Sequence, residues 1–254
     1  MRVFGKLFEV YMFNFIFVAY HSFKFYFMTL IEAIQARHSV RKYKNIPLPE
    51  EIISNLSQKI EELNAEGNLH IQFVTNEPKG FNGILNYGVF GGITNYFVVA
   101  GKKSDDLDER AGYYGEQLVL LAQQLGLNTC WAGLTYKKVD GTYSLADGEK
   151  IVCYIAVGYG ETQGTERKHR SIADLSNASS TTPNWFNRGV EMARLAPTAV
   201  NQQKFYIECL GESGGKHKVK AKTRFSLAGY TKLDLGIVKL HFEIGADKEN
   251  FEWL

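Results

Sequence analysis

The sequence predicts a fold that contains both α-helices and β-strands, because helix-like and strand-like patterns occur along most of the chain. Apolar residues recur at helical spacing in five segments, whereas short runs rich in Val, Ile, Phe and Tyr lie between them and are typical of strands. With 254 residues, the chain can bury a sizeable core as one large domain or two small ones. A hydrophobic content of 45% and a charged content of 22% are ordinary for a globular protein.

The first helix is predicted to begin at Thr29, because Thr29 and Glu32 have the spacing of a capping box. Pro49 suits the first position of a second helix, which we expect to stop between Asn64 and Asn68. Strands are predicted at residues 69–75 and 96–101, with a Gly- and Asn-rich loop at 80–95. The apolar faces of the two helices consist of Leu30, Ile31 and Ile34, and of Ile52, Ile53, Leu56, Ile60 and Leu63.

A third helix is predicted to end at Gly126, a natural residue for the left-handed position after a helix. Its apolar face consists of Leu118, Leu121, Ala122 and Leu125. The apolar run 151–159 predicts a buried strand. Further along, we expect a helix after Thr182 and Pro183, strands at 205–210 and 216–222, and a last helix at 234–244.

We expect four parts along the chain. Residues 1–27 form an N-terminal extension, 28–165 a first half, 166–182 a linker and 183–254 a second half. The polar stretch 161–182, with its charged run 166–170, favours the linker. A weak internal sequence similarity supports two related halves. Residues 113–116 precede a helix and a Cys-Trp pair. Residues 235–237 likewise precede a helix, which we expect to end in Phe251-Glu252-Trp253.

Residues 1–27 are dense in Phe and Tyr and do not match the rest of the chain. Their longest apolar run, 10–20, is interrupted by Asn14 and is shorter than the roughly 18–20 residues that a membrane-spanning helix needs. No small-residue cleavage site follows it, which argues against a signal peptide. Our leading interpretation is an upstream extension from a misplaced start, and a membrane-surface anchor is the alternative.

The segment Arg37-His38-Ser39-Val40-Arg41 carries the most specific chemical signal. In an extended segment alternate side chains point the same way, so Arg37, Ser39 and Arg41 would face one ligand. Guanidinium groups match phosphate oxygens bidentately, and a Ser hydroxyl adds a small donor. The pattern therefore indicates a phosphate clamp, and a solvated basic turn is the alternative.

Two further motifs follow in order, Gly126-Leu-Asn-Thr-Cys-Trp-Ala-Gly133 and Ala196-Pro-Thr-Ala-Val-Asn-Gln-Gln203. With all three motifs, the chain from about Met28 onward resembles the FMN-dependent nitroreductase family, and in particular its subfamily with two related halves in one polypeptide. The resemblance implies an α+β fold, a nitroreductase-like sandwich with a mixed, largely antiparallel sheet, flanking helices and two pseudo-symmetric halves. It also implies an internal pseudo-dimer, which leaves open whether the chain is a monomer or a homodimer.

The resemblance implies an FMN site. Asn201 and Gln203 offer amides for the polar edge of the flavin ring. Ala132 and Gly133 lack bulk, so their backbone could approach the cofactor closely. The implied cofactor-binding residues are Arg37, His38 (as a spacer in the clamp), Ser39, Arg41, Ala132, Gly133, Pro197, Thr198, Asn201 and Gln203. The loop 88–92 is expected near the cofactor, whereas Cys130 and Trp131 are interpreted as core residues.

The implied activity is hydride transfer from NADH or NADPH to small-molecule acceptors, either nitroaromatics or quinones. FMN carries the redox chemistry, so no side chain is expected to be catalytic. Two alternatives stay open, an FMN reservoir or regulator without turnover and other flavin chemistry on the same scaffold. The family's Asn-x-Gln-Pro-Trp pattern is replaced here by Lys204 and Phe205 after Gln203, which leaves the range of acceptors in doubt.

Composition excludes several other classes. The net charge of +2 is too small to indicate nucleic-acid binding. The alternating lysines at 216, 218, 220 and 222 lack interleaved aromatic residues and predict a strand whose solvated face guards a sheet edge. Cys130, Cys153 and Cys209 have no metal-like spacing and cannot all pair, so we expect no metal site and a reducing, cytoplasmic location. A membrane contact is expected only if residues 1–27 provide it.

Overall fold

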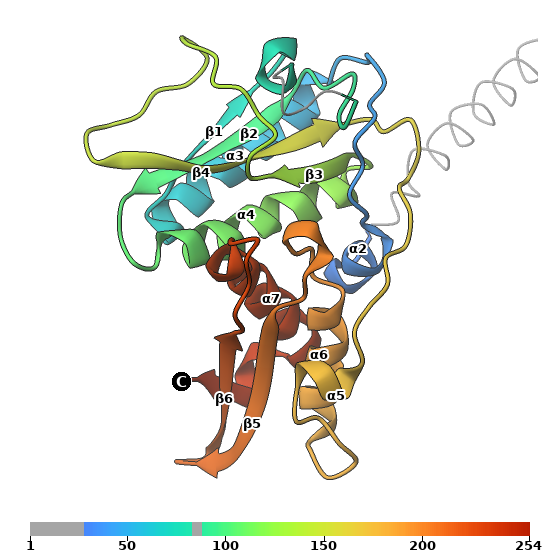
Figure 1. Ribbon diagram of the computed structural model, residues 1–254, viewed down its shortest axis with the longest axis vertical. Helices are drawn as coiled ribbons and strands as arrows, with labels where there is room; N and C mark the ends of the chain where they lie inside the picture. The colour runs from blue at the N-terminus through green and yellow to red at the C-terminus, as the bar shows by residue number, and fades with distance from the viewer. Residues whose placement is uncertain (1–27, 83–87) are drawn as a thin grey trace, which may run out of the picture.

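Two long helices, α4 and α7, pack against each other between two separate β-sheets (Figure 1). The computed structural model describes residues 28–82 and 88–254, so the expected extension 1–27 and part of the expected loop 80–95 lie outside the described residues. The helices are α2 (Leu30–Ala36), α3 (Glu50–Gly67), α4 (Leu107–Gln124), α5 (Ile172–Leu175), α6 (Asn184–Arg194) and α7 (Thr231–Ala246), with single 3-10 turns η1 (Pro78–Phe81), η3 (Ala199–Asn201) and η4 (Lys248–Asn250). The strands are β1 (His70–Val74), β2 (Tyr96–Lys102), β3 (Asn128–Ala132), β4 (Glu149–Gly158), β5 (Phe205–Ser213), β6 (Lys216–Thr223) and β7 (Phe251–Trp253).

The first sheet has the strand order β1-β2-β4-β3 and is antiparallel throughout. One face packs on α3 and α4 and forms a core with Leu56, Leu63, Phe97 and Ile155. The opposite face carries a second apolar cluster that includes the stacked rings of Tyr96 and Tyr154. Both faces are covered, which explains why strands β2 and β4 read as continuous apolar runs.

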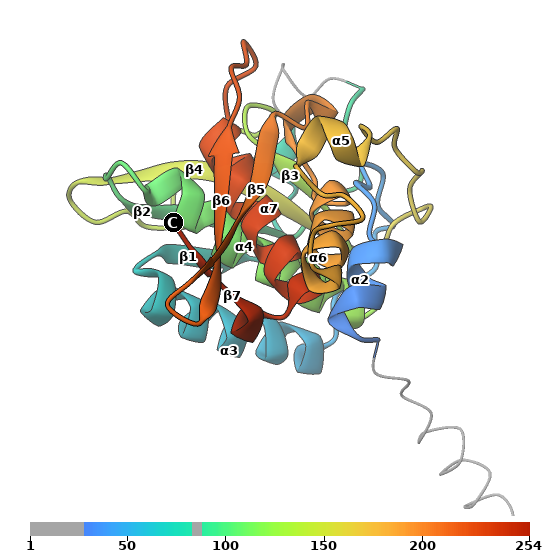
Figure 2. The same ribbon diagram turned by 90° about the horizontal axis from the view of Figure 1, so that it is seen from below.

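The second sheet has the order β5-β6-β7, in which β5 and β6 are antiparallel and β6 and β7 are parallel. It packs with α6 and α7 around Phe186, Phe205 and Phe242 (Figure 2). The predicted α+β class, with a largely antiparallel arrangement, is therefore confirmed, although the strands form two sheets and not one.

Two expectations about the second sheet are wrong. Strand β6 lies between β5 and β7, so its segment 217–219 does not guard an edge, whereas Lys220 and Lys222 lie beyond the residues that pair with β7. Residues 251–253 form this strand and do not end a helix: α7 stops at Ala246, and Asp247 follows with a φ of 64°. A three-residue strand is too short to show alternation in a sequence.

The predicted helix ends agree closely with the structure. Thr29 Oγ1 accepts a hydrogen bond from the Glu32 N–H, and Glu32 Oε2 accepts one from the Thr29 N–H, as a capping box requires. Helix α4 ends in a Schellman motif: the Leu127 N–H donates to the Ala122 carbonyl at 2.8 Å, and Gly126 has a φ of 77°. Pro49 differs by one position, because it precedes the first helical residue of α3.

Strand β3 was not predicted, although it is central to the architecture. It begins at Asn128, directly after the α4 C-terminal motif, and pairs with β4. The Trp131 side chain packs against the core under the first sheet and also against the core around α7. This strand therefore joins the two cores and brings its C-terminal end to the place where they meet.

Candidate functional site

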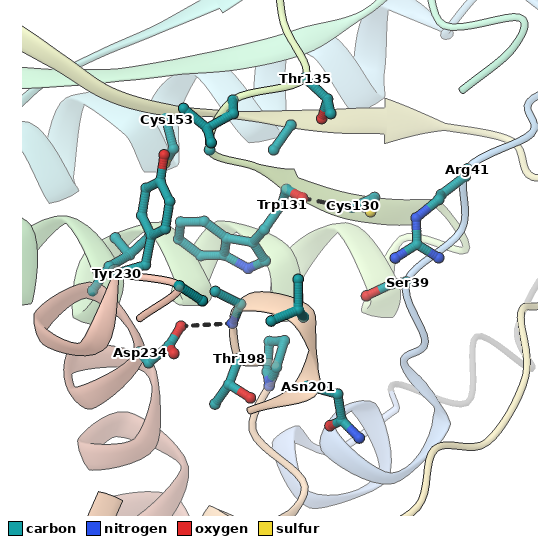
Figure 3. A pocket seen from close by; sticks show the side chains of 18 of the residues that line it. Ser39, Arg41, Cys130, Trp131, Thr135, Cys153, Thr198, Asn201, Tyr230 and Asp234 are labelled. Atoms are coloured by element: carbon teal, nitrogen blue, oxygen red, sulfur yellow. Dashed lines mark hydrogen bonds between the residues drawn. The ribbon is translucent and has the colours of Figure 1, made fainter. Parts of the chain in front are cut away.

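A cavity of about 630 Å³ opens where the two cores meet, beside the C-terminal end of β3 (Figure 3). Its walls come from β3, the N-terminal part of α7, the turn η3 and the segment around Ser39. It is lined by seven of the ten residues expected at the cofactor: Ser39, Arg41, Ala132, Gly133, Pro197, Thr198 and Asn201. Val89 and Phe90, from the loop 88–92, line it as well.

The segment 37–43 runs alongside β3, as its sequence predicts for an extended clamp. The Val40 N–H donates to the Thr129 carbonyl at 3.0 Å, and Ser39 forms a β-bridge with Thr129. Ser39 and Arg41 consequently both reach the cavity (Figure 3). Arg37 instead lines a neighbouring cavity of about 220 Å³, together with His38.

Arg37 is buried, with 3% of its surface exposed. Its Nε and Nη1 atoms have no hydrogen-bond partner among the described residues. Burying these two N–H groups without acceptors costs free energy, because they have lost their hydrogen bonds to water and formed none within the protein. Arg37 also lowers the pKa of His38, in addition to the larger effect of burial.

Arg167 lines both cavities and was not predicted as a site residue. Burial lowers its pKa to about 10, and the positive charge of Arg37 adds to this shift. Among the described residues, none of the three side chains Arg37, Arg41 and Arg167 forms an ion pair. Arg41 and Arg167 thus line the main cavity, and Arg37 and Arg167 line the neighbouring one, so Arg167 connects the two sites of positive charge.

The turn η3 forms the opposite wall in a strained backbone conformation. Val200, Asn201 and Gln203 have φ values of 45°, 55° and 47°, a region that residues with a side chain rarely adopt and that a β-branched residue adopts least. Asp234 at the start of α7 holds this turn: its Oδ1 accepts the Ala199 N–H at 2.9 Å, and its Oδ2 accepts the Gln202 side-chain amide at 2.7 Å. Burial raises the pKa of Asp234 to about 6, although both hydrogen bonds oppose that shift.

Asn201 and Gln203 tie the same turn to the segment that carries Arg167. The Asn201 amide donates to the Lys168 carbonyl at 2.9 Å, and the Gln203 amide donates to the same carbonyl at 3.1 Å. Gln203 Oε1 accepts the Arg170 N–H at 2.9 Å. Gln203 is buried and does not line the cavity, so in this structure its amide supports the turn from behind.

Trp131 lines the cavity as well as filling both cores (Figure 3). Its indole Nε1–H donates to Glu116 Oε2 at 2.9 Å, and Glu116 Oε1 lies 2.9 Å from His241 Nε2. His241 Nδ1 lies 3.2 Å from the Met192 carbonyl, which can only accept, so Nδ1 carries a proton. Glu116 and His241 are fully buried, and they must share one further proton between Oε1 and Nε2.

The small residue at position 133 serves a local packing need. A Cβ atom at Gly133 would lie 2.5 Å from the ring of Tyr230, which also lines the cavity. Cys130 borders the cavity too, and burial raises the pKa of its thiol. A larger residue at position 133 would therefore require the Tyr230 ring to move, independently of any ligand.

The residues that the sequence did not reveal are Arg167, Tyr230 and Asp234. Arg167 belongs to a charged run that reads as a solvated linker, and its burial depends on contacts with distant parts of the chain. Within residues 28–82 and 88–254, no cluster of His, Cys, Asp and Glu side chains could hold a metal ion. No helix in the same ranges is both long and apolar enough to cross a membrane.

The α+β fold and the cavity where its two cores meet agree with a protein of the nitroreductase type. Residues 29–246 match the model of the family described as "Putative TM nitroreductase", and the chain belongs to this family. The chain resembles the crystal structure of a "putative nitroreductase" from Thermotoga maritima MSB8, with a TM-score of 0.58 and 24% identity over 88% of this chain and 86% of that one. This likeness shows the fold.

Two other solved structures are more distant. The FMN-dependent nitroreductase from Clostridium difficile R20291 has a TM-score of 0.43 and 18% identity over 60% of this chain and 97% of that one. The NADPH:FMN oxidoreductase from Vibrio harveyi, complexed with NAD⁺, has a TM-score of 0.48 and 16% identity over 61% of this chain and 79% of that one. No curated protein matches the chain.

Proposed function

We propose that this protein is an FMN-dependent oxidoreductase that takes hydride from NADH or NADPH and reduces a nitroaromatic or quinone acceptor. The observation that carries the proposal is that Arg37, Arg41 and Arg167 form no ion pair with any described residue. Arg41 and Arg167 line a largely apolar cavity, and Arg37 lines the neighbouring cavity that Arg167 also reaches. A phosphate monoester would supply the missing charge and acceptors. An aromatic ring system would fill the apolar part. Membership of the nitroreductase family supports this proposal.

The residues present fit FMN. Arg37, in the neighbouring cavity, offers two buried nitrogen atoms that need acceptors, and Arg41 and Arg167 offer positive charge in the main cavity. With Ser39, these groups would hold the phosphate, and His38 would act as a spacer. Beyond the phosphate, Ala132, Gly133 and Pro197 would border the flavin ring, and Thr198 and Asn201 would approach its polar edge. Gln203 would act through its support of the turn η3.

Bound FMN would supply the two-electron chemistry, so the tasks of this chain are binding, orientation and exclusion of water. Asp234 would keep the turn η3 in place through its bonds to Ala199 and Gln202. The buried Glu116 would fix the orientation of the Trp131 indole at the cavity wall.

The division into two related halves is part of the same proposal. The cavity takes Ser39 and Trp131 from the first half and Asn201 and Asp234 from the second, as an interface between two subunits would. The expected linker 166–182 contributes Arg167 to the cavity and contains helix α5.

The decisive experiment is to purify the protein, reconstitute it with FMN, and record its absorption spectrum under anaerobic conditions. We expect a yellow protein that NADH or NADPH bleaches and that a quinone or nitroaromatic reoxidises. Binding without bleaching would instead favour the FMN reservoir. A protein that does not retain FMN after reconstitution would overturn the proposal.

A further inference from the structure

Tyr230 lies at the opposite end of the main cavity from Ser39 and Arg41 (Figure 3). In that view the Trp131 indole stands between them. The proposed function gives Ser39 and Arg41 to the phosphate of FMN, so Tyr230 borders the part of the cavity that is farthest from this group. The Tyr230 hydroxyl also adjoins Gly133, because a Cβ atom at Gly133 would lie 2.7 Å from the hydroxyl oxygen. A ligand at this end of the cavity would therefore meet the hydroxyl.

The backbone of Tyr230 fixes the position of its ring. The residue has a φ of 59° and a ψ of 10°, in the left-handed region that bulky residues rarely adopt. Its carbonyl accepts the Asp234 N–H at 2.9 Å, the bond with which α7 begins. Strained conformations of this kind persist only where the surrounding structure holds them, and they are common at ligand sites. The fold thus holds a tyrosine at the cavity wall in spite of the strain.

The Tyr230 hydroxyl is free to bind a ligand. Within residues 28–82 and 88–254, it forms no hydrogen bond. The Trp131 indole and the Asn201 amide, which line the same cavity, already donate to other parts of the chain. Burial raises the pKa of Tyr230, so the hydroxyl keeps its proton at neutral pH and can donate it in a hydrogen bond.

We propose that Tyr230 is the hydrogen-bond donor to the acceptor, and that its hydroxyl donates to an oxygen atom of the nitro group or quinone carbonyl. This inference rests on the proposed function and names the residue that selects and orients the substrate. The oxygen of such an acceptor gains negative charge as the acceptor is reduced, so a donor placed beside it favours the reaction. Tyr230 keeps its own proton throughout.

The first test measures binding without turnover. Acetophenone and ethylbenzene have the same ring and length, but ethylbenzene has a methylene group in place of the carbonyl. The full chain, loaded with FMN, is compared with Tyr230→Phe, which removes only the hydroxyl. Tyr136→Phe is the matched control, because Tyr136 is a half-buried tyrosine that stacks on Tyr154 and does not line the cavity. Equilibrium titration gives the dissociation constants of both ligands and of FMN.

We expect Tyr230→Phe to raise the dissociation constant of acetophenone about fivefold, the effect of one lost hydrogen bond. The dissociation constants of ethylbenzene and FMN should not change, and Tyr136→Phe should match the unaltered protein. Equal losses for the two ligands would assign Tyr230 to packing alone and overturn the inference. Unchanged acetophenone binding, or weaker FMN binding, would also overturn it.

The second test follows reoxidation of the reduced flavin by rapid mixing. A methylated benzoquinone presents carbonyl oxygens to the site, whereas ferricyanide takes up electrons without accepting hydrogen. Tyr230→Phe should slow reoxidation by the quinone about fivefold, in line with the binding effect. Reoxidation by ferricyanide and reduction by the nicotinamide donor should keep their rates. Equal slowing with both oxidants would contradict a contact with the acceptor oxygen.

Two further outcomes separate this inference from a competitor and from the proposed function. Thr135 also lines the cavity with a hydroxyl. A selective loss of acetophenone binding in Thr135→Val, with none in Tyr230→Phe, would assign the contact to Thr135 and overturn the inference. If FMN does not bind, the proposed function fails. Calorimetry with acetophenone and ethylbenzene on the FMN-free protein then still decides whether the Tyr230 hydroxyl binds a carbonyl oxygen.

Discussion

Gly112 of α4 and Gly236 of α7 occupy reciprocal positions where these two helices cross. A Cβ atom at Gly112 would lie 2.0 Å from the Leu233 carbonyl oxygen, and one at Gly236 would lie 1.9 Å from the Glu109 carbonyl oxygen. The helices therefore touch through their backbones. Asp234 lies in the first turn of α7, and Tyr230 directly precedes this helix. The contact between α4 and α7 therefore sets the distance between the two walls of the cavity.

Gly112→Ala should destabilise the protein by about 1–3 kcal/mol, the range for overpacking in a dense interior. The direction of the change in stability is informative, because alanine has a better helix propensity than glycine and would stabilise an exposed helical position by about 1 kcal/mol. Denaturant unfolding would measure the change. Gln123→Ala on the same helix is the control. A stabilised Gly112→Ala variant would show that the helices separate more easily than this packing implies.

Arg167→Ala should weaken FMN binding by about 1.5–3 kcal/mol, the range for hydrogen bonds to charged groups. It should change the stability of the FMN-free protein little, because relief of the repulsion by Arg37 opposes the loss of the hydrogen bond from Arg167 to the Leu195 carbonyl. Equilibrium flavin titration and thermal melts would measure the two effects. The control is Arg170→Ala, an exposed arginine of the same run that lines neither cavity. Equal losses in both variants would remove Arg167 from the phosphate end.

Asp234 should make the protein less stable as the pH rises. Its pKa is about 6 when folded and 3.8 ordinarily, so between these values the folded state holds more protons than the unfolded state. Its contribution therefore falls by roughly 3 kcal/mol as the pH rises from about 4 to above 6. The difference in unfolding free energy between the unaltered protein and Asp234→Asn, measured by urea titration across this range, isolates the effect. A difference that does not vary with pH would contradict it.

The variants Glu116→Gln and Glu116→Ala should differ sharply in their free energies of unfolding. With His241 neutral at Nε2, the glutamine amide can donate to that nitrogen while its oxygen accepts the Trp131 indole N–H, so every hydrogen bond is preserved. Alanine leaves both partners buried and unpaired, and it should cost about 3–5 kcal/mol. Unfolding measurements on both variants, with Trp131 fluorescence as a report on the cavity wall, would test this. Similar losses of stability in the two variants would show that the contact between Glu116 and His241 requires a carboxylate at position 116.

The sequence predicted best those features that depend on neighbouring residues. The Thr29–Glu32 capping box and the Gly126 helix end are decided by backbone groups within a few positions, and both are confirmed. Strand β3 was missed because its five residues follow a helix end directly and are nearly all buried, so they show no alternation. The burial of Arg167 was missed for a different reason: it depends on Arg37, Leu195 and the turn η3, all distant in sequence.

In the candidate site, too, the sequence predicted what neighbouring residues decide and missed what depends on distant ones. Ser39 and Arg41 reach the cavity because an extended segment alternates its side chains, which a sequence shows directly. Gln203 belongs to the same motif as Asn201, yet it is turned inward, because three left-handed residues reverse the local direction of the chain. Backbone reversals of this kind follow from the bonds to Asp234 and Lys168, which no local pattern reveals.

The strained turn η3 also has a consequence for how the protein is made. Its conformation is held by Asp234, which lies near the C-terminal end of the chain, so a nascent polypeptide that lacks α7 cannot close this wall of the cavity. Any ligand of the cavity would therefore bind only after α7 has been synthesised. Once bound, it would link the earliest described residues to the last helix and stabilise the entire folded chain.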